Sequence, residues 1–109
     1  MRLQVIEYRF EPGTSMKLVE NHLALAAVAA EGIYGLKRVQ REAGFLVDKK
    51  RFACVVDTTT HVGKTLDKVF ACILNRSIGE DAYRVCRLSE EKRNSRTRRR
   101  RERRQRFGQ

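Results

Sequence analysis

Four stretches of the chain alternate apolar and polar residues or are dense in β-branched and aromatic ones, the patterns typical of β-strands. They cover residues 2–10, 36–47, 51–57 and 83–88. A Pro-Gly pair follows the first stretch, and three charged residues, 48–50, lie between the second and the third. The pattern therefore predicts four strands, with a tight hairpin joining the middle two.

Two further segments repeat apolar residues at the spacing of one helix face. The first begins after Thr14 or Ser15, either of which is a suitable N-cap. Its apolar residues are Met16, Val19, Leu23, Ala26, Ala27, Ala30 and Tyr34. The second follows three consecutive threonines and ends at Gly79; its apolar residues are Val62, Leu66, Val69, Phe70 and Ile73. We expect both segments to be helices that pack against the sheet.

The resulting order, βαββαβ, predicts an α+β fold of the ferredoxin-like kind. In such a fold two helices cover one face of a four-stranded antiparallel sheet, and the other face stays open for a ligand, a nucleic acid or a second subunit. We expect residues 1–88 to form this domain and residues 89–109 to form a separate C-terminal arm, flexible alone or helical when bound.

Positive charge is concentrated at the C-terminal end of the sequence. The net charge is +11, and residues 92–109 hold 10 Lys/Arg and one Asp/Glu, whereas residues 1–91 hold 14 and 12. The arm has no apolar periodicity and cannot form a core. We therefore expect the arm to bind a polyanion.

Arginine outnumbers lysine nine to one in the arm. The planar guanidinium donates two hydrogen bonds to a phosphate and stacks on bases, which favours nucleic acid, and RNA over DNA. The predicted contacts are Arg93, Arg96, Arg98, Arg99, Arg100, Arg101, Arg103, Arg104 and Arg106, and the basic track is extended by Lys49, Lys50 and Arg51 on the hairpin. We expect an RNA-binding protein in a ribonucleoprotein or oligomeric assembly.

Other functions of the arm stay open at this point. It can serve as a targeting stretch or a solubilising tail, or it can capture acidic protein partners for a structural assembly subunit.

The first predicted helix has apolar residues on the side opposite its main apolar face. Leu18, Leu25 and Ala29 fall there, with Val28 nearby. Because exposed apolar stripes often mark interfaces, we expect this side to meet a protein partner or a second copy. Two tolerated surface leucines are the simpler alternative.

A third hypothesis for the function is a small enzyme. Cys54, Asp57 and His61 are close in sequence and offer a nucleophile, an acid and a base, but nothing fixes their mutual distance. Gly63-Lys64-Thr65 ends a strand-to-helix segment as in a phosphate-binding loop, yet residue 58, where the first glycine of that motif belongs, is threonine. We therefore expect no catalytic activity.

Residues 50–57 half-match the RNP1 pattern of RNA-recognition motifs. Lys50, Phe52, Ala53 and Val55 fit it, whereas its glycine and two of its aromatic positions are absent. No family is inferred from this match.

The cysteines, the histidines and the length of the apolar runs indicate the cellular compartment and the ligands to expect. Cys54, Cys72 and Cys86 are an odd number in otherwise apolar segments, which favours a reducing compartment over a disulfide framework. The histidines have no ligand partners at metal-binding spacing, and the apolar runs are short for a membrane span. We expect a cytoplasmic protein, or a nuclear one in a eukaryote, without metal, cofactor or membrane contact.

Overall fold

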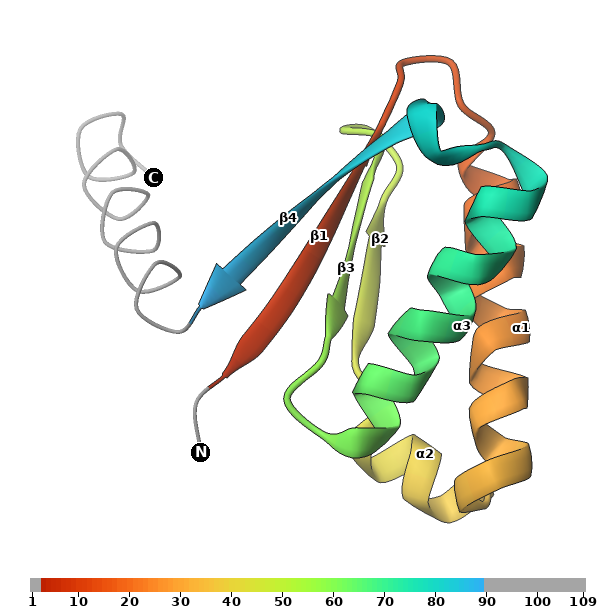
Figure 1. The fold of residues 1–109 in the computed structure, drawn as a ribbon, viewed down its shortest axis with the longest axis vertical. Coiled ribbons are helices and arrows are strands. Elements are labelled where there is room, and N and C mark those ends of the chain that lie inside the picture. Colours follow the sequence, from red (N-terminus) through yellow and green to blue (C-terminus); the bar gives the residue numbers. More distant parts are fainter. Residues whose placement is uncertain (1–2, 90–109) are drawn as a thin grey trace.

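The computed structural model describes residues 3–89, which form an α+β domain (Figure 1). A short 3-10 turn, Glu80–Ala82, precedes the last strand. The elements in chain order are β1 (Gln4–Phe10), α1 (Met16–Tyr34), α2 (Leu36–Glu42), β2 (Phe45–Asp48), β3 (Ala53–Asp57), α3 (His61–Ser77) and β4 (Tyr83–Ser89).

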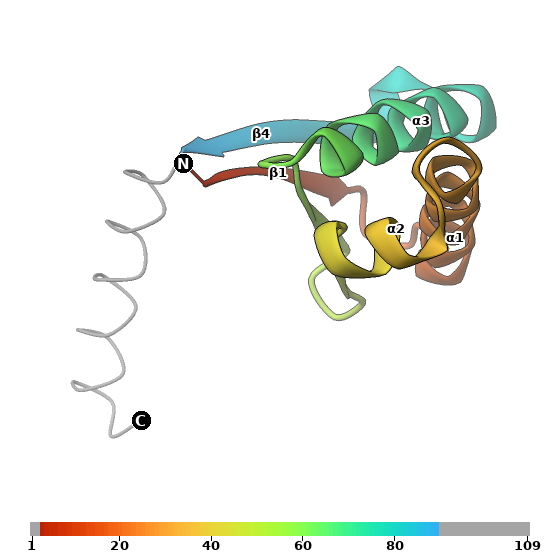
Figure 2. The ribbon, with the colours of Figure 1, turned by 90° about the horizontal axis from the view of Figure 1, so that it is seen from below.

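The four strands form one sheet in the order β2-β3-β1-β4, and each neighbouring pair is antiparallel. Both helical connections therefore skip a strand: α1 and α2 carry the chain from β1 over β3 to β2, and α3 carries it from β3 over β1 to β4. Figure 2 shows the helices on one side of the sheet. Among residues 3–89, helices therefore cover one face of the sheet, and no helix covers the other, which we call the open face.

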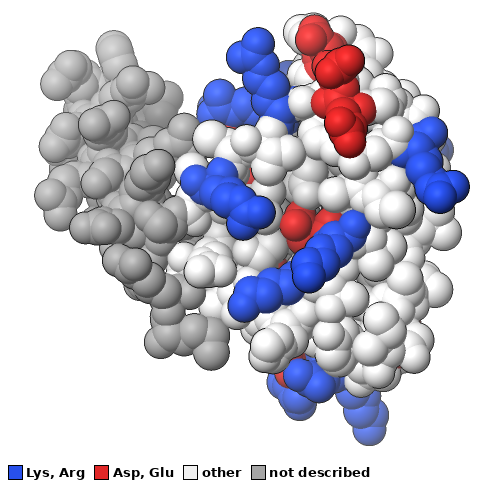
Figure 3. Space-filling view, in the orientation of Figure 1, with Lys and Arg blue, Asp and Glu red and all other residues white. Residues whose placement is uncertain are grey.

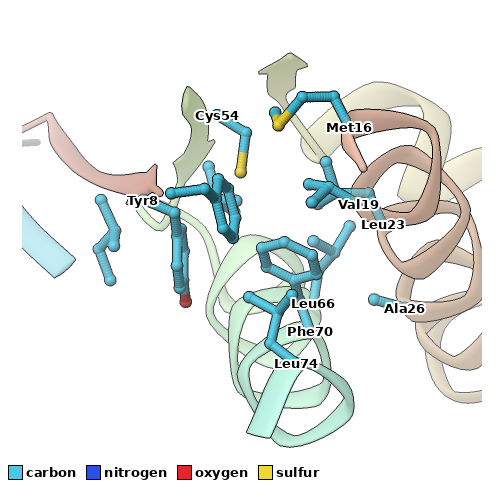
Figure 4. Packing of buried hydrophobic residues seen from close by; sticks show 12 residues of the cluster. Tyr8, Met16, Val19, Leu23, Ala26, Cys54, Leu66, Phe70 and Leu74 are labelled. Atoms are coloured by element: carbon cyan, nitrogen blue, oxygen red, sulfur yellow. The ribbon is translucent and has the colours of Figure 1, made fainter. Parts of the chain in front are cut away.

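The core lies between the sheet and the paired helices α1 and α3. Alternate residues of β1, Ile6, Tyr8 and Phe10, point into it and are at most 6% exposed. Tyr8 contacts Phe70 of α3 edge to face, with ring centroids 5.0 Å apart (Figure 4). Buried side chains of α1, α3 and β3 complete the cluster: Met16, Val19, Leu23, Ala26, Cys54, Val56, Leu66 and Leu74.

Both long helices begin at a hydroxyl cap: α1 at Ser15, one of the two predicted caps, and α3 at Thr60, the last of the three consecutive threonines. The Ser15 side chain accepts a hydrogen bond from the Leu18 amide at 3.3 Å, and the Thr60 side chain accepts one from the Gly63 amide at 3.0 Å. These bonds satisfy amides that have no partner within the helix.

Helix α3 starts in direct contact with the end of β3. A Cβ atom on Gly63 would lie 2.0 Å from the carbonyl oxygen of Asp57, closer than any side chain allows. Glycine at this position therefore lets the helix turn back over the covered face immediately after the strand.

One predicted strand is mostly helix. Residues 36–47 were expected to be extended, but α2 occupies Leu36–Glu42 and the strand is limited to Phe45–Asp48. The seven residues of α2 include good helix formers and bury only Val39, so they have no apolar alternation to stabilise a strand. Gly35, at φ 88°, ends α1 and lets α2 begin in a new direction. The domain thus has three helices, where two were predicted.

Within the described residues, no helix is long and apolar enough to cross a membrane.

Candidate nucleic-acid interface

The turn between β2 and β3 carries three consecutive cations. Lys49, Lys50 and Arg51 are all exposed. Lys49 pairs with Glu20 of α1 at 3.0 Å, and the Arg51 guanidinium lies 3.7 Å from the Asp48 carboxylate, which also accepts from the Arg51 amide at 3.2 Å. Lys50 makes no ion pair with a carboxylate of residues 3–89. The three cations therefore lie on a hairpin turn, as predicted, and Lys50 is available to a ligand.

Two arginines that the sequence reading did not single out lie side by side on the open face. Arg9 of β1 is paired in register with Ala53 of β3 on one side and with Arg84 of β4 on the other. Directly opposed like charges destabilise a sheet, and a bound phosphate would relieve this repulsion. Arg9 is partly neutralised by Glu7, at 2.9 Å. Because Ala53 follows the hairpin turn closely, these arginines and the turn occupy the same end of the sheet.

Strand alternation alone does assign Arg9 and Arg84 to the face opposite Tyr8 and Tyr83. What the sequence could not supply is the register that places one opposite the other, since the two residues are 75 positions apart.

The arm itself lies outside the described residues. This applies to Arg93, Arg96, Arg98, Arg99, Arg100, Arg101, Arg103, Arg104 and Arg106, so their role stays a prediction.

Charges on the described surface are dispersed. On the side shown in Figure 3, basic side chains are spread among uncharged ones, and acidic side chains lie near the upper edge and in the middle, beside basic ones. This side of the domain offers no broad cationic patch comparable with the charge density of the arm sequence.

Within residues 3–89, no aromatic side chain of the four strands lies on the open face, so the strands offer no ring there on which a base could stack. Tyr8 and Phe10 of β1 point into the core, and Phe45 of β2 and Tyr83 of β4 lie on the same face because they are paired with Val56 and Phe10. Phe52, the aromatic residue that fitted the RNP1 pattern, ends the hairpin turn at φ 53° and packs against the core cluster. By strand alternation and register, the open face instead carries aliphatic and charged side chains, including Val5, Val55 and Leu88.

The three residues considered for catalysis are not brought together. Cys54 points into the core at 1% exposure, and burial raises the pKa of its thiol to about 12. Asp57 is three residues further along the same strand, so its side chain lies on the opposite face. There it accepts a hydrogen bond from the Thr59 amide at 2.8 Å, while His61 is exposed at the first position of α3. A thiol held neutral in this way is a poor nucleophile.

The threonine run before α3 is occupied by structural bonds. Thr58 donates to the carbonyl of Gln4 at 3.3 Å, and Thr60 donates to the carbonyl of Glu42 at 3.2 Å while it caps α3. Thr58 therefore links the start of α3 to β1, and Thr60 links it to α2 and caps the helix.

The apolar stripe predicted on the first helix is partly exposed. Leu25 is 57% exposed and its neighbour Val28 is 62% exposed. Ala29 is also exposed, whereas Leu18 is half-buried. The outer side of α1 is thus apolar around Leu25 and Val28.

A polar pair on the covered face was not anticipated. The Tyr8 hydroxyl donates to the Asp67 carboxylate of α3 at 2.5 Å. Burial raises the pKa of Asp67, opposed by this hydrogen bond and by the positive charge of Arg87. Burial and the neighbouring carboxylate also raise the pKa of Tyr8. The hydrogen bond links the central strand β1 to α3.

Residues 3–89 contain no group of three His, Cys, Asp or Glu side chains able to hold a metal ion.

No family model, curated protein or solved structure matches the chain. The function must therefore be inferred from its own charges and geometry.

Proposed function

We propose that this protein binds nucleic acid, RNA in preference to DNA, as a component of a ribonucleoprotein or oligomeric assembly in the cytoplasm. The observation that carries the proposal is the segregation of charge in the sequence: residues 92–109 hold 10 basic side chains and one acidic one. Contacts from arginine to phosphate supply affinity with little base specificity.

The body of the domain supports this function with a second, smaller basic site. Lys50 in the turn and the opposed pair Arg9 and Arg84 occupy one end of the sheet. The chain leaves β4 at Ser89, five residues from Arg84, which at strand spacing is roughly 17 Å. Arg84 is therefore close enough to the start of the arm for one nucleic acid to contact both.

The proposal extends to the fold of the domain to which the arm is attached. We propose that residues 1–88 form a ferredoxin-like βαββαβ domain in which α2 is an addition to the connection between α1 and β2, and that residues 89–109 are the arm. Both connections that skip a strand support this assignment. The proposal includes no catalytic step.

The test is a salt series of binding to labelled single-stranded RNA and to duplex DNA. If about five arginines contact phosphate, the slope of log affinity against log salt is near −3.5 for single strands and −4.5 for duplex. Replacing the nine arm arginines with glutamine in the full chain removes most of the affinity and flattens the slope.

A matched variant with the same nine arginines changed to lysine separates charge from guanidinium chemistry. It keeps the salt slope, and it loses affinity for RNA to the extent that bidentate contacts and stacking contribute. Binding that is weak, shallow in salt and equal in the glutamine variant overturns the proposal.

A second candidate is a structural assembly subunit whose arm captures acidic proteins. The exposed apolar residues Leu25 and Val28 on α1 favour it. In that case nuclease treatment leaves the elution volume of the protein assembly unchanged, and the Leu25→Lys variant no longer forms the assembly.

A further inference from the structure

The two edges of the sheet differ in how they are protected. β2 is one edge and β4 is the other. β2 is short and exposes two large apolar side chains, Phe45 at 44% and Leu46 at 66%. β4 carries an arginine on each face, Arg84 and Arg87, and charged side chains discourage pairing between edges.

The backbone of β2 shows which groups face outward. The amide of Asp57 donates to the carbonyl of Gly44 at 2.8 Å, so Gly44 and Asp57 form a hydrogen-bonded pair. In an antiparallel ladder such pairs alternate with non-bonded ones. With the observed register, Leu46 is therefore bonded to β3, whereas the N–H and C=O groups of Phe45 and Val47 point to the free edge.

A second β2 strand fits these outward groups in one antiparallel register. When Leu46 lies opposite Leu46 of the second copy, Phe45 lies opposite Val47 and Val47 opposite Phe45. Both outward-facing residues then exchange N–H···O bonds with the other copy, and every opposed side-chain pair is apolar. A register centred on Val47 instead sets Leu46 against Asp48.

The space beside this edge accommodates the added side chains. A groove of about 340 Å³ runs between β2 and α1, lined by Glu20, Leu23, Ala24, Phe45, Leu46 and Val47. It lies on the helix side of the sheet. In the register above, Phe45 and Val47 of the second copy project on this same side and lie next to the groove.

We propose that the partner of the β2 edge is a second copy of this chain, paired antiparallel about Leu46 so that one sheet continues through both molecules. The dimer goes beyond nucleic-acid binding and does not depend on it. It gives each assembly two arms, which raises avidity for a polyanion long enough to contact both.

The test measures the molar mass of the full chain over a concentration series. Nuclease treatment and high salt remove bridging by nucleic acid, so failure of the dimer and failure of RNA binding are distinguished. The wild type is dimeric at high concentration. Leu46→Lys places two ammonium groups at the two-fold axis and raises the dissociation constant by about tenfold or more.

Val85→Lys is the matched control, since Val85 is 50% exposed on the opposite edge strand. It leaves the dissociation constant unchanged. Thermal unfolding of both variants verifies that neither change acts through loss of the fold.

A cross-link identifies the register. In a background with Cys72→Ser and Cys86→Ser, Leu46→Cys forms an intermolecular disulfide on mild oxidation, because non-bonded antiparallel pairs bring Cα atoms within disulfide range. Val85→Cys in the same background does not. A protein that is monomeric throughout, a dimer that survives Leu46→Lys, or a cross-link through Val85→Cys in place of Leu46→Cys overturns the proposal.

Discussion

The two faces of the sheet are made by the same strands and have opposite properties. On the covered face, Tyr8 and Cys54 are buried against the helices, at 2% and 1% exposure. On the open face, their sequence neighbours Glu7 and Val55 are only partly buried, and Cys86, paired with Glu7, is exposed. One residue of displacement along a strand thus decides whether a side chain contributes to stability or to the surface.

Thiol chemistry gives the largest contrast between the faces. In a Cys72→Ser variant we expect Cys86 to react with a thiol reagent at the rate of an exposed cysteine. Cys54 reacts only when the domain unfolds, because it is buried and its pKa of about 12 keeps it protonated at neutral pH. The two rates then differ by at least about 10³, the ratio of folded to unfolded molecules.

Mass spectrometry after timed labelling measures both rates in one sample. Similar rates for the two cysteines would mean that the covered face opens locally, contrary to the packing described above.

Side-chain truncation gives the next largest contrast. Phe70→Ala removes a fully buried ring that contacts Tyr8, and we expect it to lower the free energy of unfolding by about 3–5 kcal/mol. Val55→Ala on the open face costs about 1 kcal/mol or less, since its side chain is only partly buried. Denaturant unfolding of both variants gives the two values, and equal losses would contradict the distinction between the faces.

The junction that brings α3 onto the covered face gives a smaller effect. Gly63→Ala forces the helix away from the carbonyl of Asp57, and we expect a loss of about 1–3 kcal/mol. Gly32→Ala is the control. It lies in α1 with no atom within 4 Å of the added Cβ, and we expect it to stabilise the domain by about 0.5–1 kcal/mol. Thermal unfolding distinguishes the opposite signs, and a stabilised Gly63→Ala would refute the close contact.

The smallest effect concerns the carboxyl group on the covered face. The pKa of Asp67 is raised in the folded state, so ionisation is less favourable there than in the unfolded chain. The contribution of Asp67 to the free energy of unfolding is therefore fully present below the unfolded pKa of 3.8 and is lost as the pH rises through the folded pKa. The Asp67→Asn variant has no carboxyl group to ionise. Its stability relative to wild type therefore increases between the unfolded and the folded pKa of Asp67 and is level at higher pH.

Unfolding measured between pH 3 and pH 8 provides the check, with Asp81→Asn as an exposed control. A relative stability that falls over the same window would mean that Tyr8 and Arg87 outweigh burial.

Local patterns were sufficient to predict most elements of this domain. Strand alternation in β1, the apolar spacing of α1 and α3 and the Ser15 cap are properties of neighbouring residues, so they could be predicted from the sequence. The prediction missed α2, because apolar content without alternation was taken as a strand. The cap at Ser15 and the four-stranded antiparallel sheet were confirmed, with the second strand limited to Phe45–Asp48.

The site depended on information that is not local. The opposition of Arg9 and Arg84 arises from the register of strands that are distant in sequence. Asp67 lies on the polar flank of α3, where the sequence alone predicts a solvated side chain. Its hydrogen bond to Tyr8 depends on how α3 packs against β1. The contribution of the arm stays a prediction, since charge density identifies a polyanion and does not distinguish one from another.

The register of the outer strands also determines how the chain can be reconnected. Gln4 is paired with Ser89, so the first and last described residues of the sheet are neighbours. A short linker between these points, with new termini opened at Lys50 in the hairpin, would retain every strand of the sheet in a circular permutant. In such a protein the arginine-rich segment could be moved to the turn, which makes its position on the domain an experimental variable.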